Sequence, residues 1–137
     1  LILFINSFQD FNADREVGKR TWVVRTADTG TIADYSKPFA IYKGALYFTF
    51  LYVFSLGISG VVYSQFSTPW ILIALLPFLL AKKAMNMGGT WLERWAEENA
   101  DRQQLPYELL MVNVYTIGTH FMVGILLTLG YILGTIY

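Results

Sequence analysis

Two long runs of apolar residues dominate the chain. Gly44–Ala81 contains 38 residues without an acid or a base. Leu109–Tyr137 adds 29 more, in which His120 is the only side chain that titrates near neutral pH. A membrane-spanning helix needs ~20 mostly apolar residues, so the two runs have room for about three spans. We therefore predict an all-α fold, a polytopic transmembrane helical bundle.

Proline divides the first apolar run into two spans. It cannot continue a helix and it restricts the residue before it, so the segment Gln65–Trp70, which contains Pro69, predicts a tight connection. The expected spans are about 44–64, 70–87 and 109–137, and Pro77 is expected to kink the second. The chain opens on the apolar run Leu1–Ile5, and residues 1–8 are expected to be the last turns of a preceding span, which would make the chain the C-terminal part of one transmembrane domain.

Local patterns predict how the spans pack and where they meet the membrane surface. Two pairs of small residues, Gly130/Gly134 and Ser55/Ser59, have the spacing that lets helices approach closely in lipid. After the second span, Thr90 is expected to cap a short amphipathic helix. Its Trp91 and Trp95 suit the headgroup level of the bilayer.

The distribution of charge predicts the orientation. All twenty charged residues lie in Asp10–Lys43 or Lys82–Glu108, and ten of them are basic. By the positive-inside rule, the loops at about 9–43 and 88–108 face the cytoplasm and the C-terminus faces the other side. The expected location is the inner or plasma membrane of the cell.

Composition excludes several classes of protein. Apolar residues make up 55% of the chain and charged residues 15%, against ~25% in a typical soluble domain. The net charge is zero, so a basic nucleic-acid binder is excluded and no nucleic-acid partner is expected. The chain has no cysteine, which removes disulfide scaffolds, thiolate metal sites and cysteine nucleophiles.

Candidate chemistry lies at the start of the first loop. Asn6, Asp10 and Asp14 are four residues apart, so on a helix they share one face. Two carboxylates at that spacing repel each other, and a divalent cation between them would replace this repulsion by attraction. Hard oxygen ligands suit Mg²⁺, which proteins hold through one or two carboxylates plus substrate phosphates. The alternative is an ordinary solvated helix end of mixed charge.

Basic residues follow the acidic face directly. Arg15, Lys19 and Arg20 could contact the phosphates that such a metal would carry. Gly18 is expected to end the helix in a left-handed turn.

The whole segment resembles a known motif. Asn-x-x-x-Asp-x-x-x-Asp-x-x-x-Gly-Lys-Arg-Thr, from Asn6 to Thr21, is similar to the second aspartate-rich motif of the UbiA superfamily of intramembrane prenyltransferases. Three further spans follow that motif in the family, as predicted here. With Val23–Arg25 added, the segment looks most like the 1,4-dihydroxy-2-naphthoate prenyltransferases of menaquinone synthesis. It departs from their usual pattern at Ser7, Gln9, Trp22 and Val23.

The resemblance implies an activity and its residues. It implies an Mg²⁺-dependent enzyme that transfers a prenyl chain from a polyprenyl diphosphate to a lipid-soluble aromatic acceptor. Asp10 and Asp14 would be the catalytic metal–diphosphate ligands, and Asn6 would assist from the same face. Lys19 and Arg20 would contact the diphosphate, whereas Arg15 could do so or could face an acidic neighbour.

It also implies that this stretch alone is inactive, because the family's first aspartate motif belongs to helices upstream of residue 1. The expected partners are therefore the two substrates, the lipid bilayer and those N-terminal helices.

Other functions stay open at this point. The acceptor could instead be 4-hydroxybenzoate, chlorophyllide or a glycerol lipid. A transporter fragment would place charged residues inside the spans, and the predicted spans hold only His120 apart from the two lysines at the end of the second. A non-enzymatic membrane anchor makes no demand for the aspartate register. For His120 itself, a structural hydrogen bond is favoured over a functional role.

Overall fold

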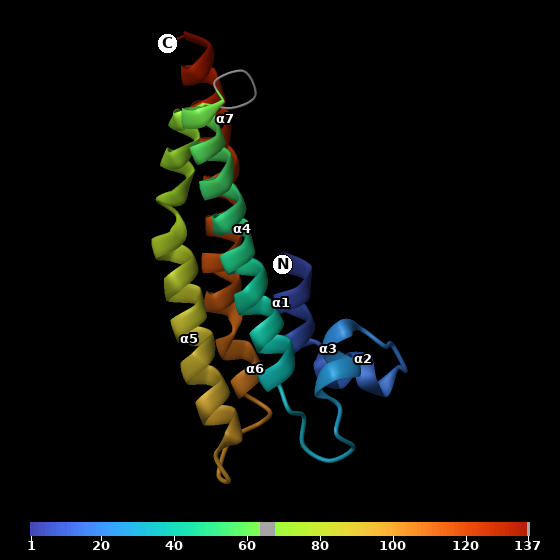
Figure 1. The fold of residues 1–137 in the computed structure, drawn as a ribbon. Coiled ribbons are helices and arrows are strands. Elements are labelled where there is room, and N and C mark those ends of the chain that lie inside the picture. Colours follow the sequence, from blue (N-terminus) through green and yellow to red (C-terminus); the bar gives the residue numbers. More distant parts are fainter. Residues whose placement is uncertain (64–67, 137) are drawn as a thin grey trace.

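The structure is a computed structural model that describes residues 1–63 and 68–136 (Figure 1). It is all-α, with no strand among the described residues. The elements are α1 (Ile2–Gln9), α2 (Phe11–Glu16), α3 (Trp22–Ala27), α4 (Ser36–Val62), the 3₁₀ helix η1 (Pro69–Leu75), α5 (Phe78–Ala96), α6 (Leu105–Glu108) and α7 (Leu110–Ile136). The predicted connection at residues 65–67 lies outside the described part of the chain.

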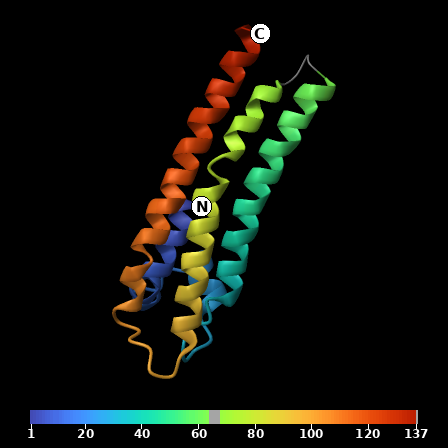
Figure 2. The ribbon, with the colours of Figure 1, turned by 90° about the vertical axis from the view of Figure 1, so that its left-hand side faces the viewer.

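Three helical runs are long and apolar enough to cross a membrane, as predicted. They are Ser36–Val62, Pro69–Ala96 and Leu105–Ile136, and they lie side by side (Figure 2). Large apolar side chains on their outer faces stay exposed, among them Phe48 on α4 and Phe121 on α7. Water would penalise that surface and lipid would not. The chain is therefore an integral membrane protein.

The second span is broken near its middle. η1 continues to Leu75, and α5 begins immediately after Pro77. Proline lacks the N–H that a continuous helix requires, so the change from 3₁₀ to α geometry occurs at this residue. The helix is therefore interrupted at Pro77, the residue at which the sequence predicted a kink.

Glycines allow the helices around η1 to approach closely. A Cβ added at Gly130 would lie 2.9 Å from the backbone of Ile71, and one at Gly134 would lie 2.5 Å from Thr68. The predicted Gly130/Gly134 contact is thus confirmed. On α4 the prediction of Ser55/Ser59 was wrong, because Ser55 is exposed. The close approach is made by Gly57, where an added Cβ would meet the side chain of Leu72, and by Gly60, where it would meet the backbone of Thr68.

The spans extend further into the polar region than predicted. α4 begins at Ser36, α5 runs to Ala96 and the third run begins at Leu105. The separate helix capped by Thr90 was wrong, because Thr90 lies inside α5. A buried stripe continues α5 past its charged residues; it comprises Ala81, Ala84, Met85, Gly88, Trp91 and Trp95. This period of three and four residues keeps the helix intact beyond the apolar run.

Trp91 and Trp95 are buried in the protein, which corrects their expected place among lipid headgroups. They are 3% and 6% exposed. Each indole N–H donates to a backbone carbonyl, Trp91 to Leu105 at 2.7 Å and Trp95 to Ala33 at 2.8 Å. The tryptophans therefore join α5 to the start of α6 and to the segment before α4.

Candidate functional site

The segment from Asn6 to Thr21, called the aspartate segment below, begins on α1 and continues through α2, and the two helices meet at Asp10. The backbone N–H of Asp10 donates to Asn6 at 3.2 Å, and that of Asp14 donates to Asp10 at 2.7 Å. These residues are therefore linked by helical hydrogen bonds, but Asn6 is half-buried, Asp10 is exposed and Asp14 is buried, so the predicted shared face stays a prediction. Asp10 lies between α1 and α2 with φ −85° and ψ 1°, so the chain bends at this residue.

A glycine turn ends α2 and reverses the chain. Gly18 has φ 72°, which confirms the predicted left-handed turn. The N–H of Gly18 donates to Arg15 at 3.1 Å and the N–H of Lys19 donates to Asp14 at 2.7 Å. These two bonds form a Schellman motif, and they bring Lys19 back beside the helix it follows.

Asp14 is the most buried acid of the candidate site. Its side chain is 8% exposed, and Lys19 Nζ lies 2.9 Å from its Oδ1. Its Oδ2 is buried without a hydrogen-bond partner. A buried carboxylate oxygen is costly to leave unsatisfied, so Oδ2 is a position where an additional cation or donor would be stabilised.

Asp10 has a different environment. It is exposed and lines an open cavity of about 370 Å³. The opposite wall of that cavity comes from Gln103, Pro106 and Tyr107, around the start of α6. Asp10 therefore lies across this cavity from the second polar loop.

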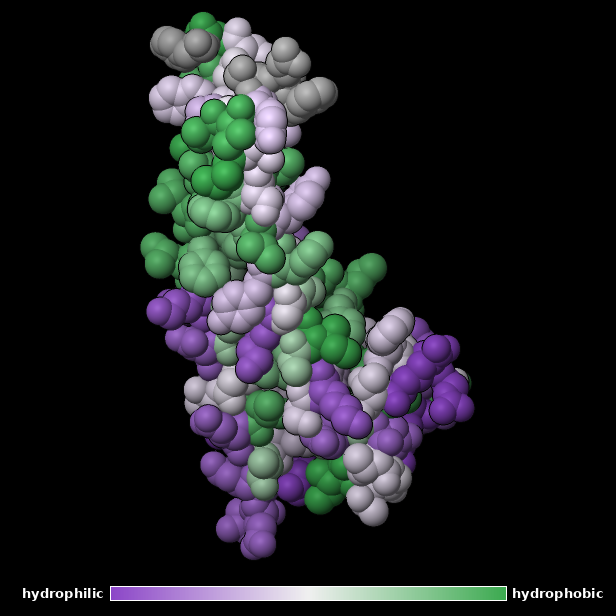
Figure 3. Space-filling model, in the orientation of Figure 1, coloured by the Kyte–Doolittle hydropathy of each residue, from purple (hydrophilic) through white to green (hydrophobic). Residues whose placement is uncertain are grey.

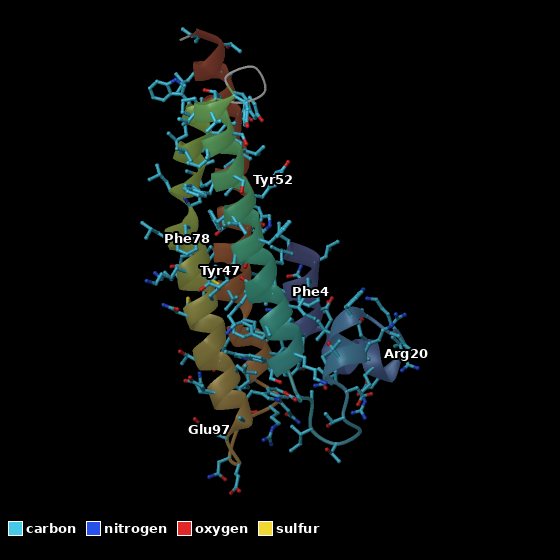
Figure 4. The ribbon with its side chains drawn as sticks, in the orientation of Figure 1. Phe4, Arg20, Tyr47, Tyr52, Phe78 and Glu97 are labelled. Atoms are coloured by element: carbon cyan, nitrogen blue, oxygen red, sulfur yellow. The ribbon has the colours of Figure 1, made fainter. Side chains whose placement is uncertain are left out.

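The structure separates the predicted basic residues. Lys19 is paired with Asp14, whereas Arg15 Nη2 lies 3.2 Å from Asp28 Oδ1. Arg20 is exposed at the outer edge of the lobe formed by α2 and α3, away from the spanning helices (Figure 4). Asn6 is half-buried on α1.

An aromatic cluster, which sequence reasoning missed, holds the aspartate segment against the bundle. Its centre is Tyr35, which is 1% exposed. Its ring stacks on Phe8 with centroids 5.4 Å apart, and it meets Phe11 edge-on at 5.4 Å. On its other side it contacts Trp91 at 5.2 Å and Trp95 at 4.9 Å. The cluster therefore connects α1, α2 and α5.

The turn before α4 fixes Tyr35 in place. The Asp34 carboxylate accepts a hydrogen bond from the Ser36 backbone N–H at 2.9 Å. Hydrogen bonds from the Ser36 side chain and backbone lower the pKa of Asp34. Burial raises the pKa of the Tyr35 phenol, which stays neutral.

A polar contact joins the segment to the third span. Asn113 on α7 is 4% exposed, and its amide donates to Gln9 Oε1 at 3.2 Å. Gln9 directly precedes Asp10, so this contact helps to position the bend. An amide inside an apolar run was the available signal in the sequence. Deeper in the same span, His120 Nδ1 donates to the Thr116 carbonyl at 2.8 Å, as a structural role would require.

The acids of this segment are the candidate ligands for Mg²⁺. No group of three or more His, Cys, Asp or Glu converges in the described residues. Asp10 and Asp14 alone offer two carboxylates, which is the number that Mg²⁺ uses when substrate phosphates complete its shell. Asp14 Oδ2 is the buried carboxylate oxygen of this pair that has no hydrogen-bond partner, so it is free to accept a ligand bond. Asp14 therefore offers one unsatisfied carboxylate oxygen, and Asp10 offers an exposed carboxylate at a separate cavity.

No family model, curated protein or solved structure matches this chain.

Proposed function

We propose that the chain contributes the second aspartate motif and three spans of an intramembrane prenyltransferase. One observation carries the proposal: the aspartate register ends in a glycine turn that places Lys19 on Asp14, at the polar end of a spanning bundle. A solvated helix end does not require a buried carboxylate with one free oxygen. The motif's resemblance to the UbiA superfamily supplies the reaction class.

The chemistry follows from charge. Asp10 and Asp14 would hold Mg²⁺, which when bound neutralises diphosphate and makes it a better leaving group. Lys19, whose Nζ lies 2.9 Å from Asp14 Oδ1, would bind a phosphate oxygen of the substrate. The apolar faces of the spans would receive the isoprenoid tail. The proposed acceptor is an aromatic lipid-soluble compound, 1,4-dihydroxy-2-naphthoate by resemblance.

Loss of Lys19 should weaken the binding of prenyl diphosphate. A charge-assisted contact is worth ~1.5–3 kcal/mol, so Lys19→Gln should raise the apparent Kd about ten- to a hundredfold. Arg20→Gln should have a smaller effect, because Arg20 lies at the outer edge of the lobe. The measurement is a titration of the active, membrane-embedded protein with prenyl diphosphate. Acceptor affinity should stay unchanged.

Lys37→Gln is the matched control, because it removes one exposed positive charge from the first turn of α4, at the same polar end of the bundle. Equal losses of affinity in Lys19→Gln and Lys37→Gln would mean that both residues act only through general surface charge. An unchanged affinity in both would remove Lys19 from the diphosphate site.

We also propose that the charged end faces the cytoplasm. Figure 3 shows the polar surface gathered at one end of the molecule and the apolar surface at the other. The chain has no cysteine, so single cysteines can report each side. Ser36→Cys and Tyr63→Cys lie at opposite ends of α4 and are both exposed. An impermeant thiol reagent outside the cell should label Tyr63→Cys alone; labelling of Ser36→Cys alone would reverse the orientation.

A further inference from the structure

A cavity between α4 and α5 lies apart from the aspartate segment. It has a volume of about 640 Å³. Lys43 of α4 and Lys82 of α5 both line it, and so do Tyr47 and Phe78. Those two rings lie together with centroids 6.2 Å apart, about halfway along the bundle (Figure 4).

The two lysines lie at the depth of a membrane surface. The helix from Lys43 to Val62 rises roughly 28 Å at ~1.5 Å per residue, close to the ~30 Å of a hydrocarbon core. The space-filling view shows the change from apolar to polar surface at about the middle of the molecule (Figure 3). The ammonium groups would therefore lie where lipid phosphates lie.

The chain itself leaves these charges unneutralised. Neither Lys43 nor Lys82 takes part in the ion pairs of the described residues. The acid in the cavity wall is Glu93, three turns beyond Lys82 on α5 and toward the polar end. Lys43 lies over the ring of Phe39 at 5.3 Å, which holds its stem along the wall. An anion is thus the missing partner of this pair.

The order of the lining groups matches the parts of a phospholipid. Tyr47 and Phe78 form the apolar end, the lysines follow, and Asn86 and Thr90 offer hydrogen bonds toward the polar end. An acyl chain, a phosphate and a headgroup with hydroxyls come in the same order. Basic pockets between spanning helices are known to bind anionic headgroups on the cytoplasmic side.

We propose that the cavity between α4 and α5 binds one anionic glycerophospholipid, with its phosphate between Lys43 and Lys82. A free phosphate could meet the lysines but would leave the aromatic end of the cavity uncovered. The site does not depend on prenyl transfer, because it contains none of the aspartate-segment residues.

The experiment titrates fluorescent phosphatidylglycerol into the full chain in zwitterionic micelles. The double variant Lys43→Gln/Lys82→Gln should raise the Kd roughly 20- to 30-fold, since each basic residue near an anionic lipid contributes about fivefold. Lys83→Gln is the matched control. It is the neighbouring charge on α5, but it lies over the ring of Tyr115 at 4.6 Å and does not line the cavity. Its Kd should stay close to that of the parent chain.

A second variant keeps the charges and fills the space. Gly89 lines the cavity, and a Cβ there would meet no atom within 4 Å, so Gly89→Phe can be accommodated in the helix. It should weaken phosphatidylglycerol binding, whereas Gly124→Phe, at an equally open position on α7, should not. This pair keeps the test valid if the double lysine variant fails to fold.

Several outcomes would overturn the proposal. Equal losses in the double variant and in Lys83→Gln would mean diffuse surface charge. Unchanged binding in the double variant, or in Gly89→Phe, would mean that the lipid lies elsewhere. Displacement of the labelled lipid by millimolar inorganic phosphate would assign the lysines to free phosphate, and resistance to that competitor supports the lipid.

Discussion

Replacing Asp10 or Asp14 by asparagine should lower the rate of prenyl transfer about a thousandfold in the active protein. A metal clamp on the leaving diphosphate stabilises charge that develops in the transition state, and several kcal/mol of that stabilisation depend on the carboxylates. Asparagine keeps the size of the side chain and removes its charge. The measurement is single-turnover transfer with saturating prenyl diphosphate and acceptor.

A second readout separates metal binding from general damage. Mn²⁺ in place of Mg²⁺ can be followed by its paramagnetic resonance, and Asp14→Asn should lose bound Mn²⁺ in the presence of prenyl diphosphate. Glu98→Gln, which removes an exposed acid from the other polar loop, should change neither readout. Near-normal turnover and Mn²⁺ binding in both aspartate variants would leave only the solvated helix end.

The two acids should differ when no ligand is bound. Asp14 holds Lys19 and has a buried oxygen without a partner, whereas Asp10 is exposed beside an open cavity. Asp14→Asn removes the ion pair with Lys19 but also removes the cost of burying a carboxylate, so its effects on stability oppose each other. Asp10→Asn should leave stability unchanged, because an exposed carboxylate is solvated by water in either state.

Features set by local sequence were predictable. The three spans, the break at Pro77 and the left-handed Gly18 each depend on residues within one helix or turn. The same is true of the register from Asn6 to Asp14, which is fixed by consecutive i to i−4 hydrogen bonds. In each case the nearest neighbours along the chain decide the conformation.

The errors arose where distant segments meet. Trp91 and Trp95 were expected in the headgroup region because tryptophan favours that depth, but carbonyls of Leu105 and Ala33 accept their N–H groups instead. The serine pair on α4 was predicted from its four-residue spacing, whereas Gly57 and Gly60, which are three residues apart, make the close approach. Which face of α4 meets η1 depends on tertiary packing. The sequence of α4 is apolar on all sides, so it does not show which face is buried.

The candidate site shows the same division. The acids and the glycine turn are local, but the pairing of Arg15 with Asp28 depends on where α3 ends. Tyr35 carried no signal in the sequence, because one aromatic residue before a long helix is common. Its importance comes from four rings supplied by segments as distant as Phe8 and Trp95.

Truncating Tyr35 should therefore have a large effect on the polar end of the bundle. Tyr35→Ala removes a fully buried ring, and such a change costs about 3–5 kcal/mol. The free energy of unfolding in mixed micelles should fall by that amount. Trp91 and Trp95 lie against the missing ring, so tryptophan emission should shift to longer wavelength as water reaches them.

Two matched variants show whether the loss of stability comes from the buried ring, from the phenol hydroxyl or from the loss of an exposed tyrosine. Tyr35→Phe keeps the ring and should retain most of the stability, whereas Tyr63→Ala, at an exposed position, should cost little. In the active protein, Tyr35→Ala should also lower prenyl transfer, because Phe8 and Phe11 then lose the contact that fixes both sides of Asp10. Unaltered stability and emission in Tyr35→Ala would show that the aspartate segment is held to the bundle by other contacts, with the amide of Asn113 as the next to test.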